Sequence, residues 1–225
     1  MYPEKAYIIR ISDPVSQQYA KGAAQSCERI GLPYEFFDGV ENKTAYDAWM
    51  QCSFPVKMMG LYKTSKIDKA ACATVSHATV WSKIAARKEV AVILEHDALM
   101  LHPVTVHIPD NMIVTLGYKL QDPKRYDHVV AGPPQKLVNI EGHEGAHAYA
   151  ITWNTAATML NELNTMGVSL PIDNTFFLKT RRTKIPLSIA DPTPAVGWIR
   201  ESTIWKESST LNYPFIESFT GNLRQ

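Results

Sequence analysis

The apolar residues of this chain fall into short continuous runs that alternate with longer segments of helical spacing. The short runs are rich in β-branched and aromatic residues, which is typical of buried strands. They occupy residues 6–11, 34–37, 90–94, 112–117 and 148–152. The longer segments, residues 14–30, 69–87 and 155–163, place apolar residues three or four positions apart, which predicts helices with one face towards a core. Because strands that alternate with helices build parallel sheets, the pattern predicts an α/β fold with a mostly parallel sheet flanked by helices.

Polar and glycine residues mark the expected ends of these helices. The segment Ser12-Asp13-Pro14 supplies turn and capping residues before the first helix, and Gly31 is placed to end it. Asn154 is expected to cap the helix at residues 155–163, and Asp173 to be the N-cap of a short helical segment that begins near residue 171.

The run at residues 90–94 ends directly in charge, with Glu95, His96 and Asp97. In open α/β sheets, ligands bind at the carboxyl ends of the strands. Two carboxylates at the mouth of a buried strand repel each other, and a divalent cation would neutralise them. Oxygen ligands suit Mg²⁺ or Mn²⁺, so Glu95 and Asp97 are candidate metal ligands, while alternation turns His96 to the other face. Strand-end charges that meet solvent or cap a turn are an equally open interpretation.

Composition limits the remaining possibilities. A chain of 225 residues suits one domain, residues 1–225, and Lys and Arg total 23 against 22 for Asp and Glu. Such a balance gives no overall field that would attract nucleic acid. Three cysteines without metal-site spacing indicate free thiols in a reducing compartment. The N-terminus enters a strand, and no apolar stretch is long enough to cross a bilayer, so we expect a soluble, cytoplasmic protein.

Other polar residues lie at positions where they could contact a ligand. Asp38 follows the strand at residues 34–37 and could hold a ribose or base, although an Asp-Gly turn without a ligand is as plausible. Ser76 and His77 lie within a helix, where a structural pair is the commoner case; no nucleophile elbow surrounds Ser76, which argues against a serine hydrolase. Gly117 closes a strand where backbone could approach a ligand. Asp173 could act as a general base if it faces a substrate hydroxyl.

Three further segments have less specific patterns. Residues 41–66 form an irregular, aromatic-rich stretch that could be a lid or could pack on the domain, and residues 122–134 are predicted to be mostly loop. Residues 141–147 gather two histidines and two acids, but without the His-Glu-x-x-His spacing of a zinc helix. A basic cluster near a chain reversal is a solvated face by default and could bind phosphate; it comprises Lys179, Arg181, Arg182 and Lys184.

Taken in order, several motifs resemble glycosyltransferase family 25, which includes bacterial lipopolysaccharide galactosyltransferase-like enzymes and collagen galactosyltransferases. The resemblance extends from Ile8 to about Ile204. The segment from Ala71 to Trp81 is similar to the family's Gly-Cys-x-x-Ser-His motif with its following Trp, and Leu94-Glu-His-Asp97 to its Leu-Glu-Asp-Asp. The further motifs are Leu116-Gly117, residues 145–152, residues 171–173 and residues 201–204. Three departures are Ala71 in place of the first glycine, His147-Ala148-Tyr149 where the later motif has Gly-Tyr, and His96 in place of the middle acid. The outer pair Glu95 and Asp97 is intact.

The resemblance implies a GT-A fold that binds a nucleotide-diphospho-sugar and moves its hexose, with inversion, to a hydroxyl of a glycan, lipid or protein. It implies Mn²⁺, or Mg²⁺, between diphosphate and the DxD-like pair Glu95 and Asp97. Asp38 would lie near the nucleoside, and Ser76 and His77 would contact the donor or support its site. His77 could equally orient a metal-site carboxylate. Asp173 is the first candidate for the base.

Two rival interpretations remain. The chain could be a nucleotide-sugar or glycan binding protein that has lost turnover, which His96 favours. It could also be a metal-dependent phosphohydrolase built on residues 95–97, which would consume a nucleotide-sugar in water at a rate that no acceptor increases.

Overall fold

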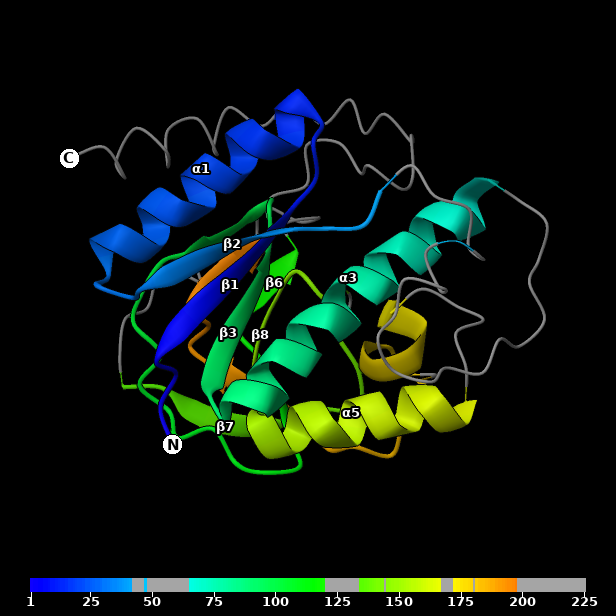
Figure 1. Cartoon of the computed structure of the whole chain (residues 1–225). Coiled ribbons are helices and arrows are strands. Elements are labelled where there is room, and N and C mark those ends of the chain that lie inside the picture. The colour runs from blue at the N-terminus through cyan, green and yellow to red at the C-terminus, as the bar shows by residue number, and fades with distance from the viewer. Residues whose placement is uncertain are drawn as a thin grey trace.

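The computed structural model describes residues 1–41, 47, 65–119, 134–143, 145–166, 172–179 and 181–197. These residues form a central seven-stranded sheet with helices on both faces (Figure 1). The α/β architecture expected from the alternation of apolar runs is therefore confirmed. Most of residues 41–66 and 122–134, Pro171, and the motif at residues 201–204 lie outside the described part of the chain.

The chain opens with a β-α-β unit, as its apolar pattern predicts. Strand β1, Lys5–Arg10, is followed by helix α1, Pro14–Arg29, and strand β2, Tyr34–Asp38, which pairs parallel to β1. Asp13 caps α1, since its Oδ1 accepts hydrogen bonds from the backbone N–H groups of Val15 at 2.9 Å and Ser16 at 3.2 Å. Gly31 follows the helix with a φ of 70°, a left-handed conformation in which glycine carries no steric cost.

Helix α3, Ser65–Arg87, leads into the central strand β3, Val90–Glu95. The other strands of this sheet are β5, Ile113–Thr115, β7, Lys136–Asn139, β8, Ala148–Thr152, and β9, Leu187–Asp191. The strand order is β2-β1-β3-β8-β5-β9-β7. Strands β8 and β7 run antiparallel to their neighbours, and the other five share one direction, so the sheet is mostly parallel.

A second, three-stranded sheet was not expected from the sequence. It contains β4, Ala98–Met100, β6, Gly117–Lys119, and β10, Ala195–Gly197, in the order β4-β10-β6. The apolar run at residues 112–117, predicted to be one strand, is therefore divided between β5 and β6. Leu116 lies between the two sheets: its N–H bonds to Ala148 and its carbonyl accepts from Ala195. Hydrophobicity continues through the run because both sheets are buried, so the pattern alone gave no sign of the change of sheet.

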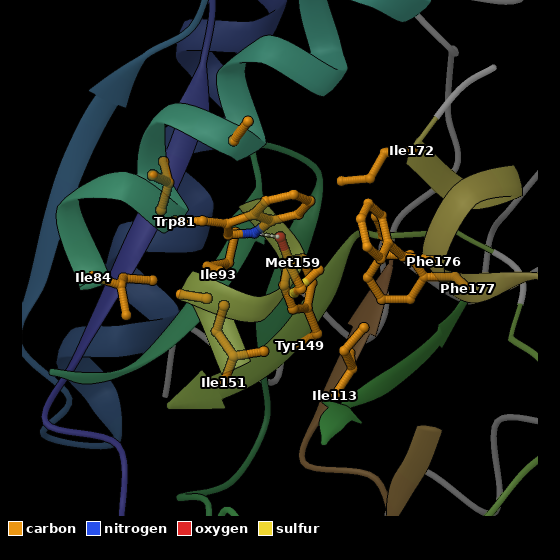
Figure 2. Packing of buried hydrophobic residues seen from close by; sticks show 14 of the residues in the cluster. Trp81, Ile84, Ile93, Ile113, Tyr149, Ile151, Met159, Ile172, Phe176 and Phe177 are labelled. Carbon is orange, nitrogen blue, oxygen red and sulfur yellow. Dashed lines mark hydrogen bonds between the residues drawn. The ribbon is translucent and has the colours of Figure 1, made fainter. Parts of the chain in front are cut away.

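Alternation along the strands separates the core into two clusters, one on each face of the main sheet. On β3, Val90, Val92 and Leu94 pack with α1, whereas Ala91 and Ile93 pack with α3 and α5, Trp153–Met166. Figure 2 shows the second cluster, where the rings of Trp81, Tyr149, Phe176 and Phe177 pack among aliphatic side chains. Glu95 continues the parity of Ala91 and Ile93, which turns it towards α3.

Two predicted helix caps are wrong. Asn154 lies inside α5, and the hydroxyl of Thr152 accepts instead from the N–H of Thr155 at 3.3 Å. Asp173 is the first residue of a π-helical turn, η2, Asp173–Phe177, whose N-cap is Ile172. In both cases the helical turn starts one or two residues earlier than predicted, after Thr152 at the end of β8 and after Ile172, which is buried in the core. Among the described residues, no helix is long and apolar enough to cross a membrane.

Candidate functional site

The carboxyl ends of β2, β1 and β3 lie side by side and present polar residues at one edge of the sheet. In the parallel register, Arg10 is opposite Asp38, and Ile9 is opposite Glu95. Helix α3 covers one face of this edge and α1 the other (Figure 1). The edge is therefore the one at which the sequence predicts a ligand site.

Glu95 is held by a chain of buried polar side chains that joins α3, β8 and β3. The Nε2 atom of His77 lies 3.3 Å from Oε1 of Glu95, and its Nδ1 atom lies 2.9 Å from the hydroxyl of Tyr149. The indole N–H of Trp81 donates to the same hydroxyl at 2.7 Å (Figure 2). His77 and Tyr149 are almost completely buried, whereas the Glu95 side chain keeps 28% of its surface exposed. One end of this series of hydrogen-bonded side chains, Trp81, thus lies in the core, and the other end, Glu95, faces the site.

His96 points away from this chain, as alternation predicts. Its ring stacks on Tyr19 of α1, with the centroids 6.2 Å apart and the planes 3° from parallel. Because α1 and α3 cover opposite faces of the sheet, His96 and Glu95 lie on opposite faces. Asp97 follows in the turn that joins β3 to β4, and its Oδ1 is buried. The histidine at the middle of the acidic motif is therefore directed away from Glu95.

Asp173 lies in the same region as Glu95, although the two residues are far apart in sequence. Burial raises the pKa of the Tyr149 hydroxyl well above 10, and the negative charges of Glu95 and Asp173 act in the same direction, against the hydrogen bond from Trp81. Both carboxylates are therefore near enough to influence one buried hydroxyl. His77 and, through it, Glu95 contact Tyr149, and the segment that begins at Asp173 packs on the same residue through Phe177, with the ring centroids 5.0 Å apart. Sequence reasoning did not single out Tyr149. One feature of the sequence could have indicated this cluster: His77 and Trp81 are four residues apart, which puts both on one face of α3.

Asp38 forms an ion pair at the end of β2. Its Oδ1 accepts a hydrogen bond from Nε of Arg10 at 2.8 Å, and the Arg10 guanidinium lies 4.1 Å from the ring centroid of Phe36. The Asp38 side chain is 76% exposed, so it remains accessible to a ligand beside Arg10. Its role near a nucleoside stays a prediction.

Ser76 and Gly117 each have a close protein contact that explains them locally. The Ser76 hydroxyl donates to the carbonyl of Cys72 and accepts from the N–H of Val40 at 2.8 Å, which ties the loop after β2 to α3. A Cβ on Gly117 would lie 2.6 Å from the carbonyl carbon of Ala195, so this glycine permits close approach of β10. Contact of either residue with a donor stays a prediction.

The histidine-rich loop at residues 141–147 packs beside the site. His143 and His147 are buried with ring centroids 5.6 Å apart, and the carbonyl of His147 accepts from the N–H of Glu95 at 2.8 Å. Within the described residues, no group of three or more His, Cys, Asp or Glu side chains is arranged to hold a metal ion. A metal held by Glu95 and Asp97 would take two protein carboxylates, and Mg²⁺-type ions are commonly bound this way, with water and phosphate oxygens completing the shell.

Part of the basic cluster is neutralised by the same loop. Lys179 forms a salt bridge with Glu141, which lowers the pKa of that carboxyl, and Arg181 donates to the Glu141 carbonyl. The N–H of His143 bonds to the carbonyl of Phe177 at 2.8 Å, so the histidine-rich loop and the segment after η2 lie together. These contacts position the segment that begins at Asp173.

Comparison with known proteins identifies the family to which this protein belongs. The profile of glycosyltransferase family 25, described as LPS biosynthesis protein, matches residues 5–176. This match spans most of the chain, so the protein belongs to glycosyltransferase family 25. The resemblance seen in the sequence motifs is confirmed, and the protein is a glycosyltransferase.

Among solved structures, the chain is similar to the crystal structure of a glycosyltransferase involved in the glycosylation of the major capsid of PBCV-1. The two share 10% identity, with a TM-score of 0.41, over 86% of this chain and 93% of that chain. No curated protein sequence matches the chain.

Proposed function

We propose that this glycosyltransferase is metal-dependent and inverting, and that it moves a hexose from a nucleotide-diphospho-sugar to a hydroxyl of a glycan, lipid or protein. The observation that carries the proposal is the buried hydrogen-bonded chain ending at Glu95, two residues before Asp97 at the carboxyl edge of the sheet. A carboxylate that is fixed and partly exposed at such an edge is suited to ligand binding.

Glu95 and Asp97 fit a Mn²⁺ or Mg²⁺ ion in donor chemistry. His77 contacts Oε1 of Glu95, and carboxylate oxygens are the donors that these ions prefer. The bound ion would offset the negative charge that grows on the diphosphate leaving group. His96 faces α1, so its replacement of an acid leaves the Glu95 side of the motif unchanged. This geometry favours an active enzyme over a binding protein that has lost turnover.

Asp173 is the proposed general base. Inversion needs a carboxylate on the side of the sugar opposite the leaving group, where it accepts the proton of the acceptor hydroxyl. Asp173 is half-buried at the start of η2 and near enough to Glu95 for both charges to act on Tyr149. Asp38 is proposed at the nucleoside and Gly117 at the donor, with Ser76 holding the loop that carries Asp38.

The donor nucleotide and the acceptor are proposals, and the family description supports the choice of acceptor. We propose UDP-hexoses as the first donors and a lipopolysaccharide-type glycan as the first acceptor, in line with the description of the family. Cys27 and Cys72 are buried and are not joined in a disulfide, which is in keeping with the proposed cytoplasmic location.

The test uses Asp97→Asn, with Asp191→Asn as the matched control, because Asp191 is exposed and contacts only Lys136 at 4.0 Å among its ion-pair partners in the described residues. Release of nucleoside diphosphate is measured with a panel of sugars and acceptors, with Mn²⁺ and with a chelator. We expect Asp97→Asn to lower transfer by roughly 10²-fold or more, because it removes electrostatic stabilisation of the leaving group. The thermal shift caused by Mn²⁺ and nucleotide should disappear in the same variant.

Three outcomes contradict the proposal. Near-normal transfer by Asp97→Asn, with unchanged metal dependence, excludes the assigned site. Nucleotide-sugar binding without transfer to any acceptor supports the degenerate binding protein. Donor consumption in water at a rate that no acceptor increases supports the phosphohydrolase.

A further inference from the structure

The hydroxyl of Tyr149 is the centre of the polar chain that reaches Glu95. Tyr149 is fully buried on β8, and its hydroxyl contacts both Nε1 of Trp81 at 2.7 Å and Nδ1 of His77 at 2.9 Å. The rings of His77 and Tyr149 are stacked, with centroids 5.8 Å apart. A buried hydroxyl with two polar neighbours on one helix fixes both by hydrogen bonding and by packing.

The donors and acceptors of this chain can be assigned by counting hydrogens. An indole N–H can only donate, so the hydroxyl oxygen of Tyr149 accepts from Trp81. The tyrosine remains protonated, because burial raises its pKa well above 10. Among its contacts with described residues, the acceptor for its hydrogen is Nδ1 of His77. In the neutral imidazole, which carries one ring hydrogen, that hydrogen then lies on Nε2, which donates to Oε1 of Glu95.

The opposite tautomer is disfavoured at both ends of the ring. A hydrogen on Nδ1 would point at a hydroxyl that already accepts from Trp81, and the hydroxyl's own hydrogen would lose its acceptor. The lone pair on Nε2 would then face the carboxylate of Glu95. Both contacts favour the hydrogen on Nε2.

We propose that Tyr149 is a positioning residue, which acts through His77 to hold Oε1 of Glu95 and so fixes the orientation of this carboxylate at the site. This inference rests on the proposed metal-dependent transfer, because it assigns a purpose to the orientation of Glu95. Partners that orient a ligand carboxylate affect metal affinity by about 10–100-fold when they are removed.

Tyr149→Phe removes the hydroxyl and keeps the ring. Tyr7→Phe, elsewhere in the protein, is the matched control. Tyr7 is also fully buried in the same cluster, and its hydroxyl donates to Glu89 at 2.6 Å and accepts from Arg87 at 3.0 Å. Arg87 is ten residues along α3 from His77, which is roughly 15 Å of helix. Tyr7→Phe therefore makes the same chemical change at the other end of the helix.

The first measurement is the affinity for Mn²⁺ in the presence of UDP, by titration calorimetry, together with kcat and KM. We expect Tyr149→Phe to weaken Mn²⁺ binding by about tenfold or more and to lower kcat, with the donor KM in saturating metal nearly unchanged. Tyr7→Phe should stay close to wild type in metal affinity even if it lowers the melting temperature equally. Unchanged Mn²⁺ affinity in a folded Tyr149→Phe variant would overturn the inference.

The second measurement is the ¹⁵N spectrum of the histidine side chains in the metal-free protein, with His77→Gln used for assignment. We expect the hydrogen of His77 on Nε2, and a shift of the Nδ1 resonance in Tyr149→Phe. A hydrogen on Nδ1 in the wild-type protein would overturn the inference even if Tyr149→Phe fails to fold. If the wild-type protein neither binds Mn²⁺ nor transfers sugar, the proposed function fails, and the spectrum alone then decides whether Tyr149 sets the state of His77.

Discussion

Gly117 lies where strand β6 meets β10, and adding one methyl group there tests the packing of the second sheet. A Cβ on Gly117 would lie 2.6 Å from the carbonyl carbon and in contact with the carbonyl oxygen of Ala195, and 3.0 Å from the nitrogen of Val196. All of these atoms are backbone, so no side-chain rotation can relieve the contact. Gly117→Ala must therefore separate β6 from β10 at their paired residues Gly117 and Ala195.

Overpacking of this kind costs about 1–3 kcal/mol, and more where the neighbour is fixed backbone. For a domain of this length, each kcal/mol corresponds to about 2–4 °C in melting temperature. We expect urea unfolding of Gly117→Ala to show a free energy of unfolding lower by at least about 1–3 kcal/mol, with an unchanged m-value.

Gly22→Ala is the matched control because it makes the same substitution inside α1. The nearest atom to its Cβ would be Cδ2 of Leu99 at 3.8 Å, an ordinary contact. Alanine is favoured over glycine in a helix interior by about 0.5–1 kcal/mol, so Gly22→Ala should be more stable than wild type. We therefore expect the free energy of unfolding to fall in Gly117→Ala and to rise in Gly22→Ala.

A Gly117→Ala protein as stable as wild type would refute the packing argument. If that protein also bound UDP-hexose less tightly, the glycine would be explained by approach of a ligand instead, as the sequence suggested. Loss of stability with normal affinity per folded molecule would support the contact with β10.

Two further predictions concern polar contacts. Ser76→Ala leaves the N–H of Val40 without the hydroxyl that it bonds at 2.8 Å, and we expect urea unfolding to show a loss of about 1–3 kcal/mol. Thr74→Val removes a hydroxyl that, among the described residues, bonds to the carbonyl of Ala70 in its own helix, so the loss of unfolding free energy should be clearly smaller. Equal losses would argue against the loop contact. The hydrogen bond from Lys83 lowers the pKa of Glu35 to about 2, below its unfolded value, so this contact stabilises at neutral pH and is lost as pH falls from about 4.5 towards 2. In thermal unfolding between pH 5 and 2, the melting temperature of Glu35→Gln should therefore fall less with decreasing pH than that of the wild-type protein. An identical pH dependence in the two proteins would contradict the pairing of Glu35 with Lys83.

Much of the fold could be predicted from local patterns. Asp13 and Gly31 mark the ends of α1 by their own side-chain and backbone preferences, and the run at residues 90–94 lies in β3 as expected. Asn154 and Asp173 show where such reasoning fails, since both have good capping side chains and neither is a cap. The hydroxyl of Thr152, the last residue of β8, caps α5 instead of Asn154, and the turn at Asp173 starts from Ile172, which is buried in the core.

The candidate site was only partly predictable. Glu95 and Asp97 could be selected because charge follows directly on a buried strand, and His96 could be assigned to the other face by alternation. Tyr149 could not be selected, because its importance depends on β8 lying antiparallel beside β3 and on α3 covering both.

The sequence by itself determined the elements and their polarity, because helical spacing, alternation and glycine preferences act over a few neighbouring residues. It also determined the family, through the order of its motifs. Only the tertiary structure decided which distant side chains meet: Trp81, Tyr149, His77 and Glu95 form one hydrogen-bonded chain, with Asp173 close by. Such meetings depend on strand order and helix packing, which arise from the burial of the whole core rather than from any local preference.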